Sequence, residues 1–174
     1  MNGIHDIMFN YLSVNDDNHD IYNDFVSKLQ RFHDVSDSII VPNGVSDPPP
    51  NYTPDISLFL KSIKYGDIAI CRYLYSNNKY DIHAYYELPF RWACETGRCE
   101  IAKWLYNLAL ATRSPIDTNT FYYAAFRLAA QNGHFDVVQW LLTISMPDEI
   151  AFDCAIKVAY LRKKYDMMNY LFNL

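Results

Sequence analysis

A pattern that recurs along the chain is the strongest constraint on its fold. Three segments align on a glycine: FLKSIKYGDIAICRYLY, FRWACETGRCEIAKWLY and FRLAAQNGHFDVVQWLL. They begin at Phe59, Phe90 and Phe126, and a fourth segment, IKVAYLRKKYDMMNYLF, fits the same frame from Ile156. The spacings of 31, 36 and 30 residues are close to the roughly 33 residues that separate units in one kind of repeat array. The sequence therefore predicts stacked units built on one plan.

Each unit has the pattern of a helix, a tight turn and a second helix. Phe90, Ala93 and Cys94 lie at i, i+3 and i+4, which places them on one stripe of a helix. Gly97 follows, at the position where a helix that ends in a left-handed residue favours glycine. One such helix pair cannot bury its own stripe, whereas stacked pairs can, so the pattern predicts an all-α solenoid. The second helix of this unit has its own apolar stripe, made of Ile101, Ala102, Trp104 and Leu105.

Small residues and polar connections fit the same plan. We expect the small residue in each first helix to allow close approach of neighbouring helices. Polar or turn-forming stretches at 76–87, 107–120 and 143–149 are expected to form projecting, hairpin-like loops. The small residues are Ser62, Ala93, Ala129 and Ala159.

Composition excludes several classes of protein. Fifteen Lys and Arg against 20 Asp and Glu give a net charge of −5, which argues against nucleic-acid binding and against a polybasic membrane patch. Four cysteines are too few for a disulfide scaffold, and no apolar run is long enough to span a membrane. The N-terminus lacks the pattern of a signal peptide. We therefore expect a cytoplasmic protein with free thiols.

Residues 1–50 lie outside the clear repeats. Ile21, Phe25, Leu29 and Phe32 have helical spacing, which predicts an amphipathic helix at about 20–33. The run of prolines that ends at Pro50 breaks any helix there. We expect a helical N-terminal cap or degenerate repeat over 1–50, followed by the repeat array over 51–174.

The repeat units resemble the ankyrin repeat. Pro89 and Phe90 stand in the position of that family's TPLH tetrad, Ala93 and Cys94 in that of its paired alanines, and Gly97 at its turn glycine. Gly133 and His134 reproduce its Gly-His pair. The sequence of the second repeat, with FRWACETG and AKWLYNL, is most similar to ankyrin proteins of giant DNA viruses. The resemblance covers about residues 55–174 and implies an ankyrin-type helix-turn-helix solenoid of about four repeats.

Three departures from the family pattern bear on structure. Arg91 and Arg127 replace the tetrad's histidine, whose family role is a hydrogen bond that braces neighbouring hairpins. Lys163 replaces the turn glycine of the last unit, so we expect that turn to be strained or differently shaped.

Two chemical readings are open to the cysteines and histidines. Cys94 and Cys99, with His83 and His134, could be zinc ligands, but the Cys-x4-Cys spacing is poor and no second pair follows. Cys94 also occupies a core alanine position, where small buried thiols are common. A catalytic reading of the histidines lacks a nucleophile, base and orienting carboxylate in one arrangement. We predict no metal, no cofactor and no enzyme.

Exposed tyrosines at the junction of loop and first helix are the best candidates for a binding surface. Tyrosine combines a large contact area with a polar tip and little rotamer entropy, which suits it to interfaces. The alternative is that a chain with 15 Tyr exposes some without purpose. In the ankyrin family these junctions line the partner-binding face, with turn residues at its edge. The resemblance therefore implies partner-binding residues Tyr85, Tyr86, Glu87, Arg98, Tyr122, Tyr123, His134, Phe152 and Asp153.

The sequence thus predicts a non-catalytic module that binds a protein partner, as a monomer or weak homo-oligomer. The viral resemblance implies a host or viral partner in the host cytoplasm. The alternative is a structural protein that self-assembles through an uncapped C-terminal helix, because the apolar residues Met167, Met168, Leu171 and Phe172 are expected to leave apolar surface there.

Overall fold

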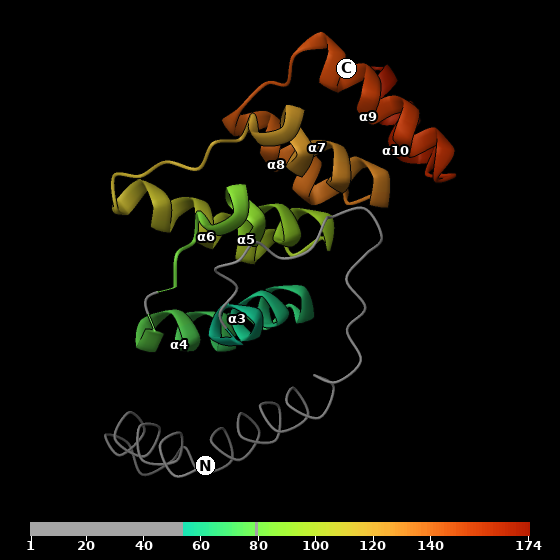
Figure 1. Ribbon diagram of the computed structural model, residues 1–174. Coiled ribbons are helices and arrows are strands. Elements are labelled where there is room, and N and C mark those ends of the chain that lie inside the picture. Colours follow the sequence, from blue (N-terminus) through green and yellow to red (C-terminus); the bar gives the residue numbers. More distant parts are fainter. Residues whose placement is uncertain (1–53, 79) are drawn as a thin grey trace. The chain divides into compact units, whose positions relative to one another are not determined.

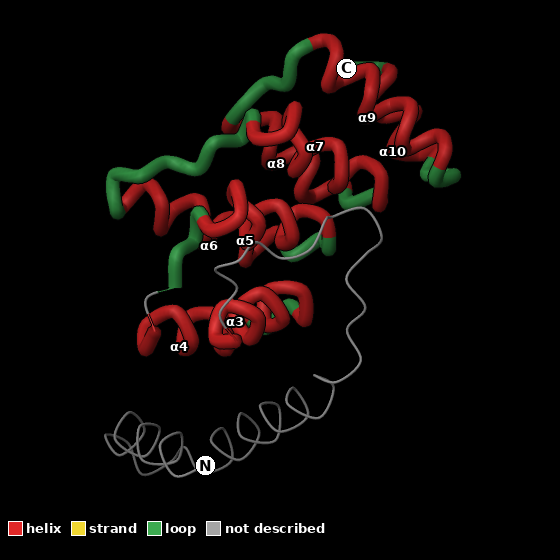
Figure 2. The backbone as a smooth tube through the Cα atoms, viewed as in Figure 1, coloured by secondary structure: helices red, strands yellow, loops and turns green. Residues whose placement is uncertain are grey.

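The computed structural model describes residues 54–78 and 80–174, where it contains eight helices and no strand (Figure 2). The predicted N-terminal cap, with its helix at about 20–33, lies outside these residues. The helices form four consecutive pairs: α3 Pro54–Tyr65 with α4 Ile68–Asn78, α5 Ala84–Glu95 with α6 Cys99–Ala111, α7 Thr120–Asn132 with α8 Phe135–Ile144, and α9 Glu149–Leu161 with α10 Tyr165–Phe172.

The pairs stack one on the next within 54–174 (Figure 1). The first helices contact each other in the order α3, α5, α7, α9, and the second helices contact each other in the order α4, α6, α8. Phe59, Phe90 and Phe126, which open the repeat pattern, are buried between the layers. The small residue of every first helix is fully buried where neighbouring helices meet, as the pattern predicted: Ser62, Ala93, Ala129 and Ala159. The all-α solenoid of four units is therefore confirmed.

The tight turns have the left-handed backbone that their glycines suggested. Gly66, Gly97 and Gly133 have φ angles of 94°, 72° and 81°. After Gly97, the amide of Arg98 donates to the carbonyl of Ala93 at 2.8 Å, which closes the helix end. Lys163, which replaces the fourth glycine, keeps the same conformation at φ 60°. This lysine is therefore strained, since left-handed backbone costs a non-glycine residue about 1–2 kcal/mol.

The connections differ from the expected loops in one respect. Helix α4 continues to Asn78, α6 to Ala111 and α8 to Ile144, so helix occupies the beginning of each of the three stretches at 76–87, 107–120 and 143–149. Helix α5 begins at Ala84 and occupies the end of the first stretch as well. Within the described part of the chain, no helix combines the length and apolarity that crossing a membrane requires.

Candidate protein-binding surface

Two left-handed turns open the first helices of the second and third repeats. Tyr85, Tyr86 and Glu87 have φ angles of 54°, 57° and 62°, and the right-handed part of α5 begins only after them. The equivalent residues of α7, 121–123, have φ angles of 51°, 56° and 56°. Three successive non-glycine residues in this region are rare because each costs about 1–2 kcal/mol. Such strain persists only where other contacts hold it, and it concentrates at functional sites.

Arginine side chains hold both turns. The Nε of Arg91 donates to the carbonyl of Tyr86, and its Nη2 donates to that of Tyr85, both at 2.9 Å. Arg127 repeats the arrangement on Tyr122 and Phe121, both at 2.8 Å. Hydrogen bonds from an ionised donor are stronger than neutral ones, so two of them offset part of the strain.

Within residues 54–78 and 80–174, only the two repeats that contain this arginine have the left-handed turn. The equivalent positions in the first and fourth repeats are Leu60 and Lys157. In the fourth repeat, α9 instead begins as a regular helix, because the carboxylate of Asp148 accepts a hydrogen bond from the amide of Ala151 at 2.7 Å. The arginines that break the family's tetrad thus support a different local structure.

These turns present large apolar side chains to solvent. Tyr86 is 74% exposed and Tyr122 is 79% exposed. Phe121, about half exposed, meets the edge of the Tyr86 ring at a centroid distance of 5.5 Å. Ile150, at the start of α9, is 72% exposed. We call the three exposed rings of Tyr86, Phe121 and Tyr122, together with the neighbouring aliphatic side chain of Ile150, the aromatic surface.

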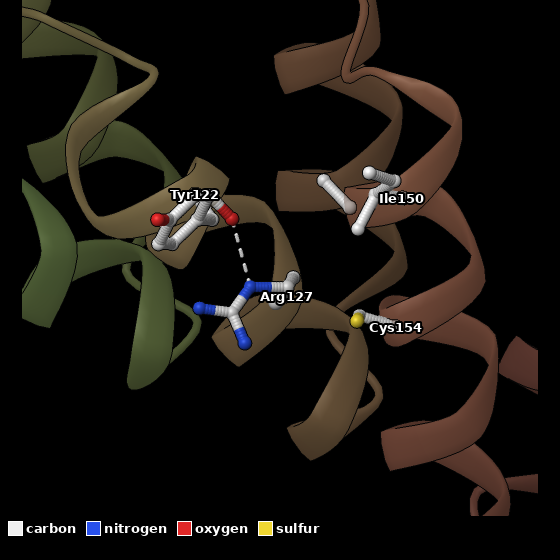
Figure 3. Close-up of a pocket in the computed structure, with 5 residues that line it drawn as sticks. Tyr122, Arg127, Ile150 and Cys154 are labelled. Atoms are coloured by element: carbon white, nitrogen blue, oxygen red, sulfur yellow. Dashed lines mark hydrogen bonds between the residues drawn. The ribbon is translucent and has the colours of Figure 1, made fainter.

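A shallow pocket of about 260 Å³ lies where the third repeat meets the fourth (Figure 3). Tyr122 and Arg127 come from α7, and Ile150 and Cys154 face them from α9. Ala151 completes the lining. The pocket therefore combines apolar walls with one guanidinium group.

The other predicted binding residues lie in several environments. Tyr85 and Tyr123 are half-buried beside the two exposed tyrosines. Phe152 is half-buried and packs on Phe126 with a centroid distance of 5.7 Å, so it contributes to the contact between repeats. Asp153 is exposed on α9.

Glu87 departs from the expected surface position. It is only 7% exposed, and its carboxylate lies 2.9 Å from Nδ1 of His83. The same oxygen accepts a hydrogen bond from the amide of Asp117, in the connection to the next repeat, at 3.3 Å. Because a buried carboxylate needs such partners, Glu87 joins two repeats from within. We leave it out of the binding surface.

Arg98 and His134 brace the turns of neighbouring repeats. Arg98 lies against Gly66 and donates through Nε to the carbonyl of Lys64 at 3.3 Å. His134 lies against Gly97, with Nε2 3.0 Å from the carbonyl of Glu95. The two carbonyls are equivalent in the repeat frame, so the same brace occurs twice. Each brace connects one hairpin to the next.

The cysteines do not form a reactive cluster. Burial raises the pKa of the Cys71 thiol to about 12, and burial followed by the neighbouring Cys99 raises that of Cys94 well above its ordinary value. Burial also raises the pKa of Cys99. Cys154 is the least buried of the four. Within residues 54–78 and 80–174, no three His, Cys, Asp or Glu side chains are grouped so as to hold a metal ion.

Alkylation of the native protein should therefore be confined largely to Cys154. The thiolate is the reactive form, and a pKa of about 12 leaves roughly one part in ten thousand of Cys71 ionised at pH 8. We expect iodoacetamide to modify Cys154 at least tenfold faster than Cys71 or Cys94, as measured by peptide mass spectrometry. The control is the unfolded protein in urea, where the three thiols should be alkylated at equal rates. Equal alkylation rates of Cys154, Cys71 and Cys94 in the native protein as well would contradict the burial of Cys71 and Cys94.

The stacked helix pairs, the left-handed turns and the exposed loop-side aromatics define the class: a helical repeat protein with a preformed surface. The sequence model of ankyrin repeats, in three copies, matches residues 59–151, more than half of the chain. The chain therefore belongs to the ankyrin-repeat family, whose members are generally protein–protein interaction modules. The match ends at the start of α9, so the fourth repeat is assigned from its fold. No curated protein matches this sequence.

Proposed function

We propose that this chain is a non-catalytic module that binds a protein partner through the aromatic surface. The observation on which this rests is the exposure of Tyr86 and Tyr122 on turns that Arg91 and Arg127 fix. A rigid surface loses little conformational entropy on binding, so its contact area contributes more fully to affinity. Large aromatic side chains in such positions are typical of residues that dominate binding energy.

We also propose that the partner is a host or viral protein in the host cytoplasm, which is a finer proposal and rests on a resemblance to ankyrin proteins of giant DNA viruses. That similarity consists of the FRWACETG and AKWLYNL wording of the second repeat.

The test is capture of partners from host-cell lysate, followed by mass spectrometry. The wild-type chain is compared with a Tyr86→Ala/Tyr122→Ala variant, which removes two exposed rings and should not change folding. A Tyr160→Ala/Tyr165→Ala variant, which removes two exposed rings from the last repeat, is the matched control. We expect a protein that wild type and control retain and the double tyrosine variant loses. Capture that is equal in all three would refute the proposed surface.

A second candidate function is self-assembly through the last repeat. Leu161 is 74% exposed and Phe172 is 77% exposed, whereas Met167 and Leu171 of the same hairpin are buried. Assembly predicts that the mass in light scattering rises with concentration and that Leu161→Asp/Phe172→Asp restores the monomer. A constant monomer mass up to high concentration would exclude this second function.

A further inference from the structure

The surroundings of the two turn-holding arginines differ between repeats. Arg91 is covered by the next repeat, because its guanidinium carbon lies 4.8 Å from the centroid of the Phe121 ring. Burial lowers the pKa of Arg91, while Glu95 and Glu87 act in the opposite direction. The contact between Arg91 and Phe121 is a cation–π contact, in which the face of the aromatic ring attracts the guanidinium cation.

The position of that ring is vacant at Arg127. Phe121 lies five residues before Phe126, and Ala151 lies five residues before Ile156, so the two are equivalent in the repeat frame. The next repeat therefore offers a methyl group to Arg127 where it offers a phenyl ring to Arg91. Ala151 and Arg127 both line the pocket of about 260 Å³.

The guanidinium of Arg127 has capacity left for a ligand. Two of its five N–H groups donate to the carbonyls of Phe121 and Tyr122. In the described part of the chain it has no carboxylate partner, and no aromatic ring covers it. Tyr122 and Ile150, which also line the pocket, expose largely apolar side chains that suit contact with a flat ring.

We propose that this pocket receives an aromatic side chain of the partner protein, which lies over Arg127 as Phe121 lies over Arg91. The inference rests on the proposed function and specifies the chemistry that the partner must present. The contact between Arg91 and Phe121 is the precedent within the chain, because Arg91 is the equivalent arginine, holds an equivalent turn and has an aromatic ring as its neighbour. A partner segment with an exposed Phe, Tyr or Trp has the complementary chemistry.

The test first selects peptide ligands from a random library and then blocks the pocket by a substitution in its lining. A phage-displayed library of random dodecapeptides is panned on the full chain, and enriched peptides are synthesised and titrated by fluorescence polarisation. Ala151→Phe supplies the ring in cis, and Ile150→Asp alters an exposed wall in case Ala151→Phe impairs folding. Leu110→Ala is the control, because Leu110 is an exposed apolar residue, like Ile150, but does not line the pocket. Helicity and unfolding midpoints are compared first.

We expect the enriched peptides to share one aromatic position. Alanine at that position in the peptide, Ala151→Phe and Ile150→Asp should each raise Kd at least tenfold, and Leu110→Ala should leave it within twofold. A bound peptide should also slow the alkylation of Cys154 several-fold, because Cys154 lines the pocket.

Three results would overturn the inference. They are the absence of any enriched peptide, enrichment of a shared carboxylate without an aromatic residue, and aromatic peptides that bind folded Ala151→Phe and Ile150→Asp as tightly as wild type. The proposed function fails separately. A lysate partner lost with Tyr86→Ala/Tyr122→Ala but retained by Ala151→Phe would leave that function intact and exclude only the pocket.

Discussion

Replacing Phe90 by alanine should lower the free energy of unfolding by about 3–5 kcal/mol. Phe90 is fully buried in the second repeat, and its ring meets the edge of Trp140 of the third repeat at a centroid distance of 6.1 Å. Truncation removes the transfer free energy of the ring and leaves a cavity between repeats, which cannot close fully in a stacked array. Denaturation in guanidinium chloride, followed by circular dichroism, measures the change.

Tyr122→Ala is the matched control for that prediction. It also removes an aromatic ring, but from a side chain that is 79% exposed. Surface changes of this kind alter stability by no more than about 0.5 kcal/mol. If the two variants lost equal stability, the assignment of Phe90 to the core and Tyr122 to the surface would be wrong.

The second large effect is expected at the turn glycine of the second repeat. Gly97→Ala should cost about 2–3 kcal/mol, of which about 1–2 comes from the left-handed backbone at φ 72°. The rest comes from His134, because an added Cβ would lie 2.5 Å from its Nδ1. The ring must move, which weakens its hydrogen bond to the carbonyl of Glu95, worth about 1 kcal/mol. Chemical denaturation again provides the measurement.

The reverse substitution in the fourth repeat provides the control. Lys163 already has φ 60°, so Lys163→Gly removes that strain at an equivalent position. Relief of the strain should raise the free energy of unfolding by about 1–2 kcal/mol, and the greater entropy of the unfolded chain should lower it by about 0.5–1 kcal/mol. The net expectation is a gain in stability of about 0.5–1 kcal/mol. A loss of stability in Lys163→Gly would show that the lysine side chain contributes more than its backbone costs.

Local spacing was sufficient to predict the repeat frame. The apolar stripes at helical period, the turn glycines and the small residues at helix contacts each follow from a short stretch of sequence. They could be predicted because helix periodicity and the freedom of glycine at positive φ act within a few residues. For the same reason the turn at Lys163 was predicted to be strained or differently shaped, and its φ of 60° corresponds to the first alternative.

The candidate surface was predicted only in part. Tyr86 and Tyr122 were named, but the handedness of the turns that present them was not, because no local preference favours three left-handed non-glycine residues. One signal was available: a tyrosine lies five residues before an arginine in both middle repeats, at Tyr86 and Arg91 and at Tyr122 and Arg127. Only the folded turn shows that the arginine donates to the preceding carbonyls.

What the sequence by itself determined is the repeating unit: two helices, a glycine turn and the residues each unit buries. The tertiary structure alone decided what neighbouring units do to each other. Glu87 became buried because the next repeat supplies the amide of Asp117 to its carboxylate. Arg127 kept an open face because the fourth repeat supplies Ala151 at the position where the third repeat supplies Phe121 to Arg91. The physical reason is the range of each effect. Periodicity and turn preference act within a few residues, whereas the burial of Glu87 depends on a residue 30 positions away and the pocket at Arg127 on one 24 positions away.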